Sequence, residues 1–179
     1  LYEQAADQGH EVAMNNLANM YAHGQGVAQS YVKARDWLER AAEGGYADAQ
    51  CVLGSYYDLG REGVAIDLPR ARMWYEKAAA QGHAKAQYNL GVMHRDGQGG
   101  PQDFTRAREL WELAAAQGYA EAMNNIGGLY AQGLGVEQDL NEAMRWFLKA
   151  KAHGHDVSRL VAAVMEERKM QNAASASKG

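Results

Sequence analysis

Three kinds of residue in this sequence could do chemistry: glycine pairs for phosphate, histidines for a metal, and a single cysteine for nucleophilic attack. The glycines form Gly-x-Gly pairs at positions 24/26, 97/99 and 133/135. A dinucleotide-binding loop follows a strand, opens a helix directly and occurs once per site. Here each pair follows a helix-like segment, and the pair recurs along the chain. The pairs therefore predict turns.

Histidines recur at one position, directly after a glycine: His10, His83 and His155. Tyr46 and Tyr119 take this position in the copies between them, which favours a packing or hydrogen-bonding ring at the start of a helix. Successive imidazoles are thus two copies apart, whereas a functional zinc site usually needs three or four converging ligands. We expect no metal site and no cofactor.

Cys51 is the single cysteine, so the chain can form no internal disulfide bond. A catalytic thiol needs a nearby histidine or another group that lowers its pKa, and the sequence specifies none. We expect Cys51 on the opposite side of its helix from Leu53, as an exposed or half-buried structural cysteine. No serine or pair of carboxylates stands out either, so we predict no catalytic residue and a protein that is not an enzyme.

The elements that carry these residues are repeated, and residues 118–154 are the clearest copy. Aspartates 36 residues apart mark successive copies: Asp67, Asp103 and Asp139. Ser30 holds the same position one copy earlier, at a spacing of 37, because the loop at 60–63 is one residue longer than its counterpart. A period of this size is typical of a solenoid built from one supersecondary unit.

The sequence of each copy predicts two helices. The first, over about 11–23 in the first complete copy, has apolar residues spaced by three and four on one face: Ala13, Leu17, Met20 and Tyr21. Gly24 and Gly26 end this helix. Ser30 suits the N-cap of the second helix, as do the aspartates in later copies.

Recurring columns predict the core. Leucine or isoleucine occupies the first column: Leu17, Leu53, Leu90 and Ile126. A small residue follows each of them: Ala18, Gly54, Gly91 and Gly127. Glycine inside a helix costs about 0.5–1 kcal/mol relative to alanine, so its recurrence predicts that another helix backbone passes close by. Large residues fill the second helix: Trp37, Trp74, Leu110 and Trp146, next to Leu38, Tyr75, Trp111 and Phe147. The third copy departs at Gly100, where the others have Val27, Val64 and Val136.

These elements predict an all-α fold with a single solenoid domain over residues 1–172. Its expected parts are the second helix of a truncated repeat at 1–10, complete repeats at 11–46, 47–83, 84–119 and 120–155, and a capping helix at 156–172, before a disordered tail at 173–179. The chain starts at Leu1 inside a repeat, so we expect a fragment or a processed form.

Charge and hydropathy restrict the partners. The net charge of the chain is −4 and its pI is about 5.9, so we expect no general attraction to nucleic acid. No apolar run approaches the roughly 18–20 residues that cross a bilayer, so no membrane insertion is expected.

The recurring string A-x-x-x-L-G-x-x-Y-x-x-G-x-G-V-x-x-D-x-x-x-A-x-x-W resembles the Sel-one-like repeat (SLR) family, a relative of tetratricopeptide repeats. The resemblance covers about residues 1–159. It implies antiparallel helix hairpins stacked into a right-handed superhelix, with the first helices lining a concave groove. It also implies a non-catalytic adaptor or scaffold for protein complexes, often in bacterial envelope and signalling systems.

Two alternatives to simple partner binding follow. The truncated start would leave the apolar side of residues 1–8 uncovered, which predicts weak self-association or docking to further repeats through the N-terminal end. Cysteine-rich secreted members of the family are linked to β-lactam hydrolysis and carry a disulfide in each hairpin. This chain, with Cys51 alone, cannot form that bridge.

A protein or peptide partner is expected on the helix face opposite the leucine column. The predicted partner-binding residues are Asn15, Asn16, Asn19, Ser55, Asp58, Tyr88, Asn89, Val92, Arg95, Asn124 and Asn125. The asparagines could pair with the backbone of an extended peptide, because an amide both donates and accepts, or they could satisfy neighbouring helices. Tyr88 and Arg95 lie two helical turns apart and are the best anchors, since Tyr and Arg dominate interface hot spots.

Overall fold

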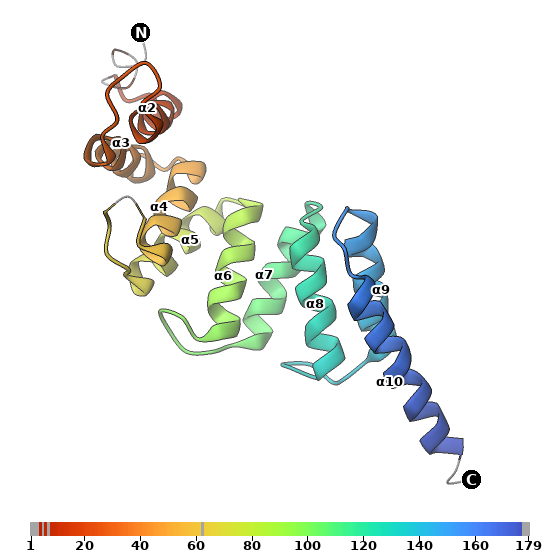
Figure 1. Ribbon diagram of the computed structural model, residues 1–179. Helices are drawn as coiled ribbons and strands as arrows, with labels where there is room; N and C mark the ends of the chain where they lie inside the picture. The colour runs from red at the N-terminus through yellow and green to blue at the C-terminus, as the bar shows by residue number, and fades with distance from the viewer. Residues whose placement is uncertain (1–3, 5, 7, 62, 177–179) are drawn as a thin grey trace. The chain divides into compact units, whose positions relative to one another are not determined.

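The computed structural model describes residues 4, 6, 8–61 and 63–176. The helices in this part of the chain are α2 (Glu11–His23), α3 (Tyr31–Glu43), α4 (Ala47–Leu59), α5 (Leu68–Ala80), α6 (Ala84–Asp96), α7 (Phe104–Ala116), α8 (Ala120–Gln132), α9 (Leu140–Ala152) and α10 (Ser158–Ala176) (Figure 1). No strand occurs among these residues. The chain divides into two compact units, residues 1–102 and residues 103–179.

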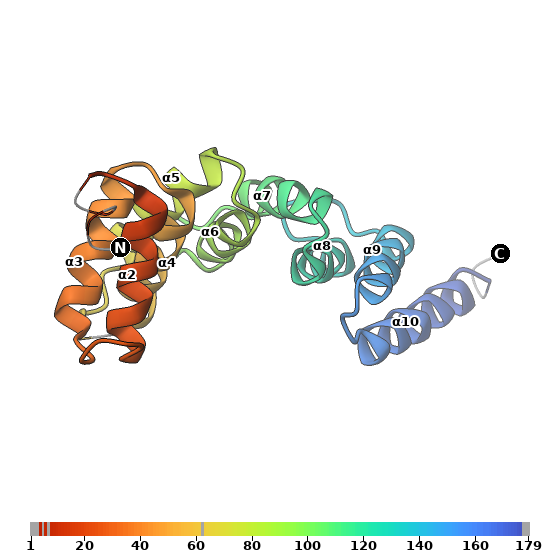
Figure 2. The same cartoon turned by 90° about the horizontal axis from the view of Figure 1, so that it is seen from above.

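Consecutive helices pack as hairpins within each unit. In the first unit α2 packs on α3 and α4 on α5, and the two hairpins meet where α3 contacts α4. Seen from above, α2 and α3 run alongside each other (Figure 2). In the second unit α8 packs on α9, with α7 against α8 and α10 against α9. The prediction of an all-α solenoid of helix hairpins with a C-terminal capping helix is confirmed.

The predicted capping residues lie at the starts and ends of these helices. The hydroxyl oxygen of Ser30 accepts a hydrogen bond from the backbone N–H of Lys33 at 3.4 Å. The three aspartates do the same at the starts of α5, α7 and α9. Each carboxylate thereby satisfies a backbone donor that has no partner inside its helix. The residue after each first helix is a glycine in the left-handed conformation: Gly24, Gly60, Gly97 and Gly133. The second glycine of each Gly-x-Gly pair also has a positive φ, so the pairs are turns as predicted.

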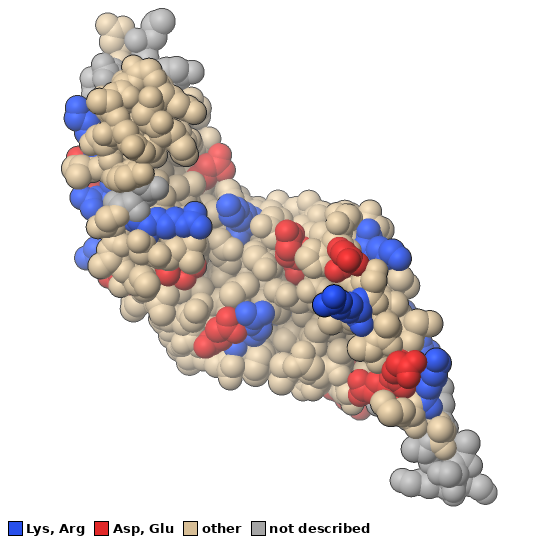
Figure 3. Space-filling model, in the orientation of Figure 1, with Lys and Arg blue, Asp and Glu red and all other residues tan. Residues whose placement is uncertain are grey.

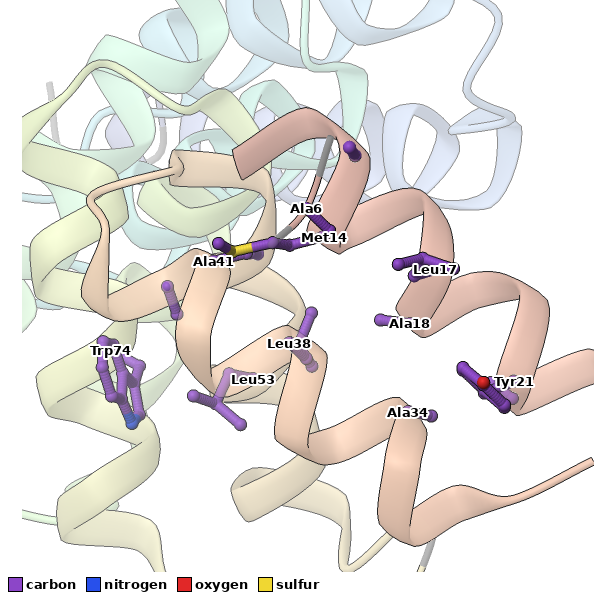
Figure 4. Close-up of a cluster of buried hydrophobic side chains, with 14 residues drawn as sticks. Ala6, Met14, Leu17, Ala18, Tyr21, Ala34, Leu38, Ala41, Leu53 and Trp74 are labelled. Atoms are coloured by element: carbon purple, nitrogen blue, oxygen red, sulfur yellow. The ribbon is translucent and has the colours of Figure 1, made fainter. Parts of the chain in front are cut away.

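The predicted columns form the core. In the first unit Met14, Leu17 and Tyr21 of α2 face Ala34, Leu38 and Ala41 of α3, and Leu53 and Trp74 continue the cluster into the next hairpin (Figure 4). Trp74 retains 8% of its surface exposed, whereas Trp37 and Trp146 are half-buried. Each of these three tryptophans lies beneath a cation three residues later: Arg40, Lys77 and Lys149.

Gly54 has a different neighbour from the one that we predicted. A Cβ atom on Gly54 would lie 2.7 Å from Cδ1 of Tyr75, so an aromatic ring, rather than a passing helix backbone, fills this space. The ring belongs to the second helix of the same hairpin. Glycine is required here because any side chain would displace the ring.

The two ends of the chain differ in how they match the predicted boundaries. At the N-terminus, Gln4 and Ala6 are helical, whereas residues 1–3, 5 and 7 of the predicted truncated repeat lie outside the described residues. At the C-terminus, α10 runs to Ala176, so residues 173–176 of the expected tail are helical. Val157, which directly precedes α10, and Val164, which lies within it, are buried. Residues 177–179 of the tail also lie outside the described part.

Candidate partner-binding face of the first helices

The predicted partner-binding residues lie on the first helices of the repeats, α2, α4, α6 and α8. Within the first unit, Asn15, Asn16, Ser55, Asp58, Tyr88, Asn89, Val92 and Arg95 are half-buried, and Asn19 is exposed. In the second unit Asn124 and Asn125 are half-buried. The leucine column, which points to the other side of each helix, is buried throughout. The helical periodicity thus separates a core side from a side that is in part accessible.

Tyr75 brings two of the predicted residues together. Its hydroxyl oxygen lies 3.5 Å from Oδ2 of Asp58 on α4 and also hydrogen-bonds the side chain of Asn89 on α6. Because Tyr75 belongs to α5, one buried hydroxyl group links polar side chains of two successive first helices. The amide of Asn89 therefore satisfies a neighbouring helix, as one of the two interpretations of the asparagines predicts.

Burial changes the acid–base properties of this cluster. Desolvation raises the pKa of the Asp58 carboxyl group, and the hydrogen bond from Tyr75 opposes that shift. The pKa of Tyr75 is raised well above its ordinary value, first by burial and then by the negative charge of Asp58. The phenol therefore stays protonated and remains a hydrogen-bond donor at neutral pH.

Arg95 is held by the residue next to it. Its Nε lies 2.6 Å from Oδ1 of Asp96, and its Nη2 lies 2.8 Å from Oδ2, so the pair is bidentate. This contact raises the pKa of Arg95 and lowers that of Asp96. A partner carboxylate would therefore meet a guanidinium group that is already oriented, but it would compete with Asp96 for the same donors.

Asn124 in the second unit and Ser55 in the first differ in whether their side-chain oxygen atoms form a hydrogen bond. The Ser55 hydroxyl group donates to the carbonyl oxygen of Val52 at 2.7 Å, within its own helix. The Oδ1 atom of Asn124 is buried and accepts no hydrogen bond from any described residue. A buried acceptor without a donor costs free energy, about 1–3 kcal/mol in proteins.

Cys51 is buried, with 3% of its surface exposed, so the prediction of an exposed or half-buried thiol is wrong. The reason is that α4 is covered on two sides, by α5 of its own hairpin and by α3 of the preceding one. Burial raises the pKa of the thiol to about 11. A thiol in this state is a poor nucleophile at neutral pH.

The histidine–tyrosine column lies at the N-caps of the first helices. Nδ1 of His83 accepts from the backbone N–H of Ala86 at 3.1 Å, which leaves Nε2 to donate to Oδ1 of Asp48 at 3.0 Å. The hydroxyl group of Tyr46 donates to Oδ2 of the same carboxylate at 2.9 Å. Asp48 therefore connects the starts of α4 and α6. Among the described residues no group of three or more metal-binding side chains converges.

We did not predict the role of a recurring glutamine, although its regular position directly before the N-cap of the second helix is visible in the sequence. The side-chain amides of Gln29, Gln102 and Gln138 donate to carbonyl oxygens at the ends of the preceding first helices, at distances between 2.7 and 2.8 Å. The equivalent residue of the second copy is Ile66. Ile66 is 65% exposed, which makes this loop unlike the others.

Acidic and basic side chains alternate on the visible side of each unit, and neither sign forms a continuous patch (Figure 3). This mixture agrees with the small net charge of −4. Within the described residues, no helix combines the length and the apolar character needed to cross a bilayer.

Comparisons with known proteins agree with this architecture. A model of the Sel1 repeat family matches residues 1–10, 12–46, 47–83, 84–119 and 120–155. Among curated proteins, none matches the chain. A protective antigen of uropathogenic Escherichia coli that displays an SLR fold is 37% identical, with a TM-score of 0.83 over 86% of this chain and 33% of the antigen. A Sel1 repeat protein from Oxalobacter formigenes is 34% identical, with a TM-score of 0.78 over 86% of this chain and 62% of that protein. The chain therefore spans less than two thirds of the length of either relative.

Proposed function

This chain belongs to the Sel1 repeat family, and we propose that it is a non-enzymatic adaptor that binds a protein or peptide partner along its first helices. Sel1 repeat proteins are generally scaffolds for protein–protein interactions. The proposal adds the location of the partner: the face formed by the predicted residues of α2, α4 and α6 in the first unit. Asn124 and Asn125 of α8 are a separate candidate surface in the second unit.

The link through Tyr75 is the observation that carries the proposal. Asp58 of α4 and Asn89 of α6 share this one hydroxyl group, which thereby connects polar side chains of two successive repeats. Tyr88 and Arg95 flank Asn89 on α6, and both are half-buried rather than fully solvated. Side chains that are already ordered lose less conformational entropy when a partner binds.

The chemistry of this face suits a peptide backbone. Carboxylate, amide and hydroxyl groups can accept hydrogen bonds from the N–H groups of an extended segment, and the amide and hydroxyl groups can also donate hydrogen bonds to its C=O groups. Tyr88 and Arg95 would supply anchoring contacts to its side chains, because both residue types concentrate binding energy at interfaces. The buried thiol of Cys51, with its raised pKa, supports a role without nucleophilic catalysis.

Selection from a peptide library displayed on phage tests the proposal. Binders selected on the whole chain should lose at least about tenfold in affinity for a Tyr88→Ala/Arg95→Ala variant, since removing two hot-spot residues costs more than 1 kcal/mol each. A Tyr31→Ala/Arg145→Ala variant removes the same two side-chain types from the second helices α3 and α9, outside this face, and should bind normally. If both variants bind every selected peptide as tightly as the original chain does, the partner does not occupy this face.

A further inference from the structure

The second helices carry an arginine column whose members differ in how tightly they are held. Each arginine has a glutamate four residues later: Arg35 with Glu39, Arg72 with Glu76, and Arg108 with Glu112. Arg72 and Arg108 reach their carboxylates at hydrogen-bond distance, and their side chains are 15% and 24% exposed. Arg35 lies 3.9 Å from Glu39, beyond hydrogen-bond reach, and its side chain is 33% exposed.

Arg72 shows how the fold can enclose such an arginine. Its Nη2 lies 3.0 Å from Nε2 of His94, and a Cβ atom on Gly100 would collide with Nη1. The loop of the third copy thus closes onto the guanidinium group, which explains why glycine replaces the valine of the other copies.

The loop opposite Arg35 leaves an open hollow instead. This is the longer loop of the second copy, and a hollow of about 400 Å³ separates it from α3. Arg35 and Glu39 of α3 line one side, Tyr57 and Arg70 line another, and Val64 and Ile66 supply the apolar wall. Binding pockets for small ligands start at about 300 Å³, so a side chain with part of its backbone fits this space. None of these residues belongs to the predicted partner-binding face.

Most of the charge around this hollow is already matched. Asp67 accepts from the backbone N–H of Arg70 at 3.0 Å and pairs with its Nε at 3.3 Å. The Arg70 guanidinium group also lies over the ring of Tyr57, 5.5 Å from its centroid. These contacts leave Arg35 as the cation in the hollow whose donors lack a carboxylate at hydrogen-bond distance among the described residues.

We propose that this hollow binds an acidic segment of a protein partner. An Asp or Glu side chain pairs with the guanidinium group of Arg35, and an adjacent apolar side chain packs on Val64 and Ile66. A guanidinium group can hold a carboxylate by two parallel charge-assisted hydrogen bonds, which are among the stronger contacts in proteins. The exposed side chain of Ile66 loses contact with water when the apolar neighbour covers it. This site is independent of the face on the first helices, so either proposal can fail alone.

The test uses the whole chain labelled with ¹⁵N and a set of short peptides with acetylated and amidated ends, Gly-Φ-Glu-Gly, where Φ is Leu, Phe or Val. Blocked ends ensure that the side chain supplies the carboxylate. We expect titration to shift the amide signals of Val64 and Ile66, and the matched Gly-Φ-Gln-Gly peptides to bind at least about tenfold more weakly. The absence of binding at millimolar concentration, or equal binding of both peptide sets, would overturn the proposal.

Three variants test whether binding depends on the contact with Arg35 or only on the net charge of the chain. Arg35→Gln should weaken binding of the glutamate peptides about tenfold or more, whereas Glu39→Gln should tighten it because a competing carboxylate is removed. Arg61→Gln removes the same charge from the loop that faces α3, at a residue outside the lining of the hollow, and should leave the affinity unchanged. If Arg35→Gln and Arg61→Gln weaken binding equally, the peptides respond to net charge and the site is wrong. Circular dichroism of each variant verifies that the helices are retained.

Discussion

The phenyl ring of Phe147 lies against the backbone of α8 at Gly127, so closely that a Cβ atom on residue 127 would come within 2.7 Å of Cε1 of the ring. The carbonyl oxygen of Ala143 would also lie 3.2 Å from that atom. The next residue, Gly128, has a different environment, because its Cβ atom would meet only Nε2 of Gln132, at 3.9 Å. Two adjacent glycines in one helix therefore differ in whether a side chain fits.

We expect Gly127→Ala and Gly128→Ala to change stability in opposite directions. Alanine favours a helix interior over glycine by about 1 kcal/mol, which should stabilise the Gly128→Ala variant. At residue 127 the added methyl group collides with Phe147 and Ala143, and overpacking costs about 1–3 kcal/mol, so net destabilisation by about 1 kcal/mol is expected. Urea unfolding followed by circular dichroism measures both. Stabilisation by Gly127→Ala would mean that the ring has room to move.

Trp74 and Trp146 occupy equivalent positions but should differ in how much stability they contribute. Trp74 is buried, so Trp74→Ala should lower the free energy of unfolding by about 3–5 kcal/mol. Trp146 is half-buried, and Trp146→Ala should cost less. Each ring has a lysine above it, at 4.2 and 4.0 Å, so the loss of that contact cancels in the comparison. Equal losses in urea unfolding would contradict the packing described above.

Cys51 should react slowly with thiol reagents until the chain unfolds. With its pKa raised to about 11, the native thiol is almost entirely protonated at pH 8, whereas a cysteine in an unfolded chain has a pKa near 8.5. Labelling with a disulfide reagent at pH 8 should therefore be roughly a hundredfold or more slower for the native chain than in guanidinium chloride. Equal rates would show that α4 opens readily.

The same raised pKa gives Cys51 a signature in stability at alkaline pH. A group whose pKa is higher in the folded state stabilises the protein below its unfolded pKa and loses this contribution as the pH rises through the folded value. Between pH 9 and pH 11 the original chain should lose stability relative to Cys51→Ala. A constant difference between the two over this range would contradict the assignment.

Asp58 and Asp96 should show opposite dependences on acidic pH. Burial raises the pKa of Asp58, so its charge is unfavourable at pH 7, and Asp58→Asn should stabilise the chain there by an amount that shrinks as the pH falls and the carboxyl group becomes protonated. The hydrogen bonds from Arg95 lower the pKa of Asp96, so Asp96→Asn should destabilise the chain at pH 7, and this loss should disappear as the pH falls through the folded pKa. Urea unfolding between pH 3 and pH 7 measures both differences. Parallel curves for the two variants would contradict these environments.

Local physics let the sequence alone determine the helices and the sides that they bury. The spacing of Leu17 and Tyr21 identified the core side of α2, and Ser30 and Asp67 identified helix starts, because periodicity and capping depend on residues within one or two turns. The 36-residue period then extended these assignments to every copy. Gly24 and the glycines equivalent to it marked the helix ends for the same local reason.

The tertiary structure alone decided which groups meet across helices. The neighbour of Gly54 is the ring of Tyr75, and the shared partner of Asp58 and Asn89 is the hydroxyl group of that same residue. The burial of Cys51 required the positions of α3 and α5 on either side of α4, which no residue spacing within α4 contains. Likewise, the enclosed Arg72 and the open Arg35 differ through the loops packed against them. Such contacts depend on the distances between helices, and those distances are set by how all the side chains pack together.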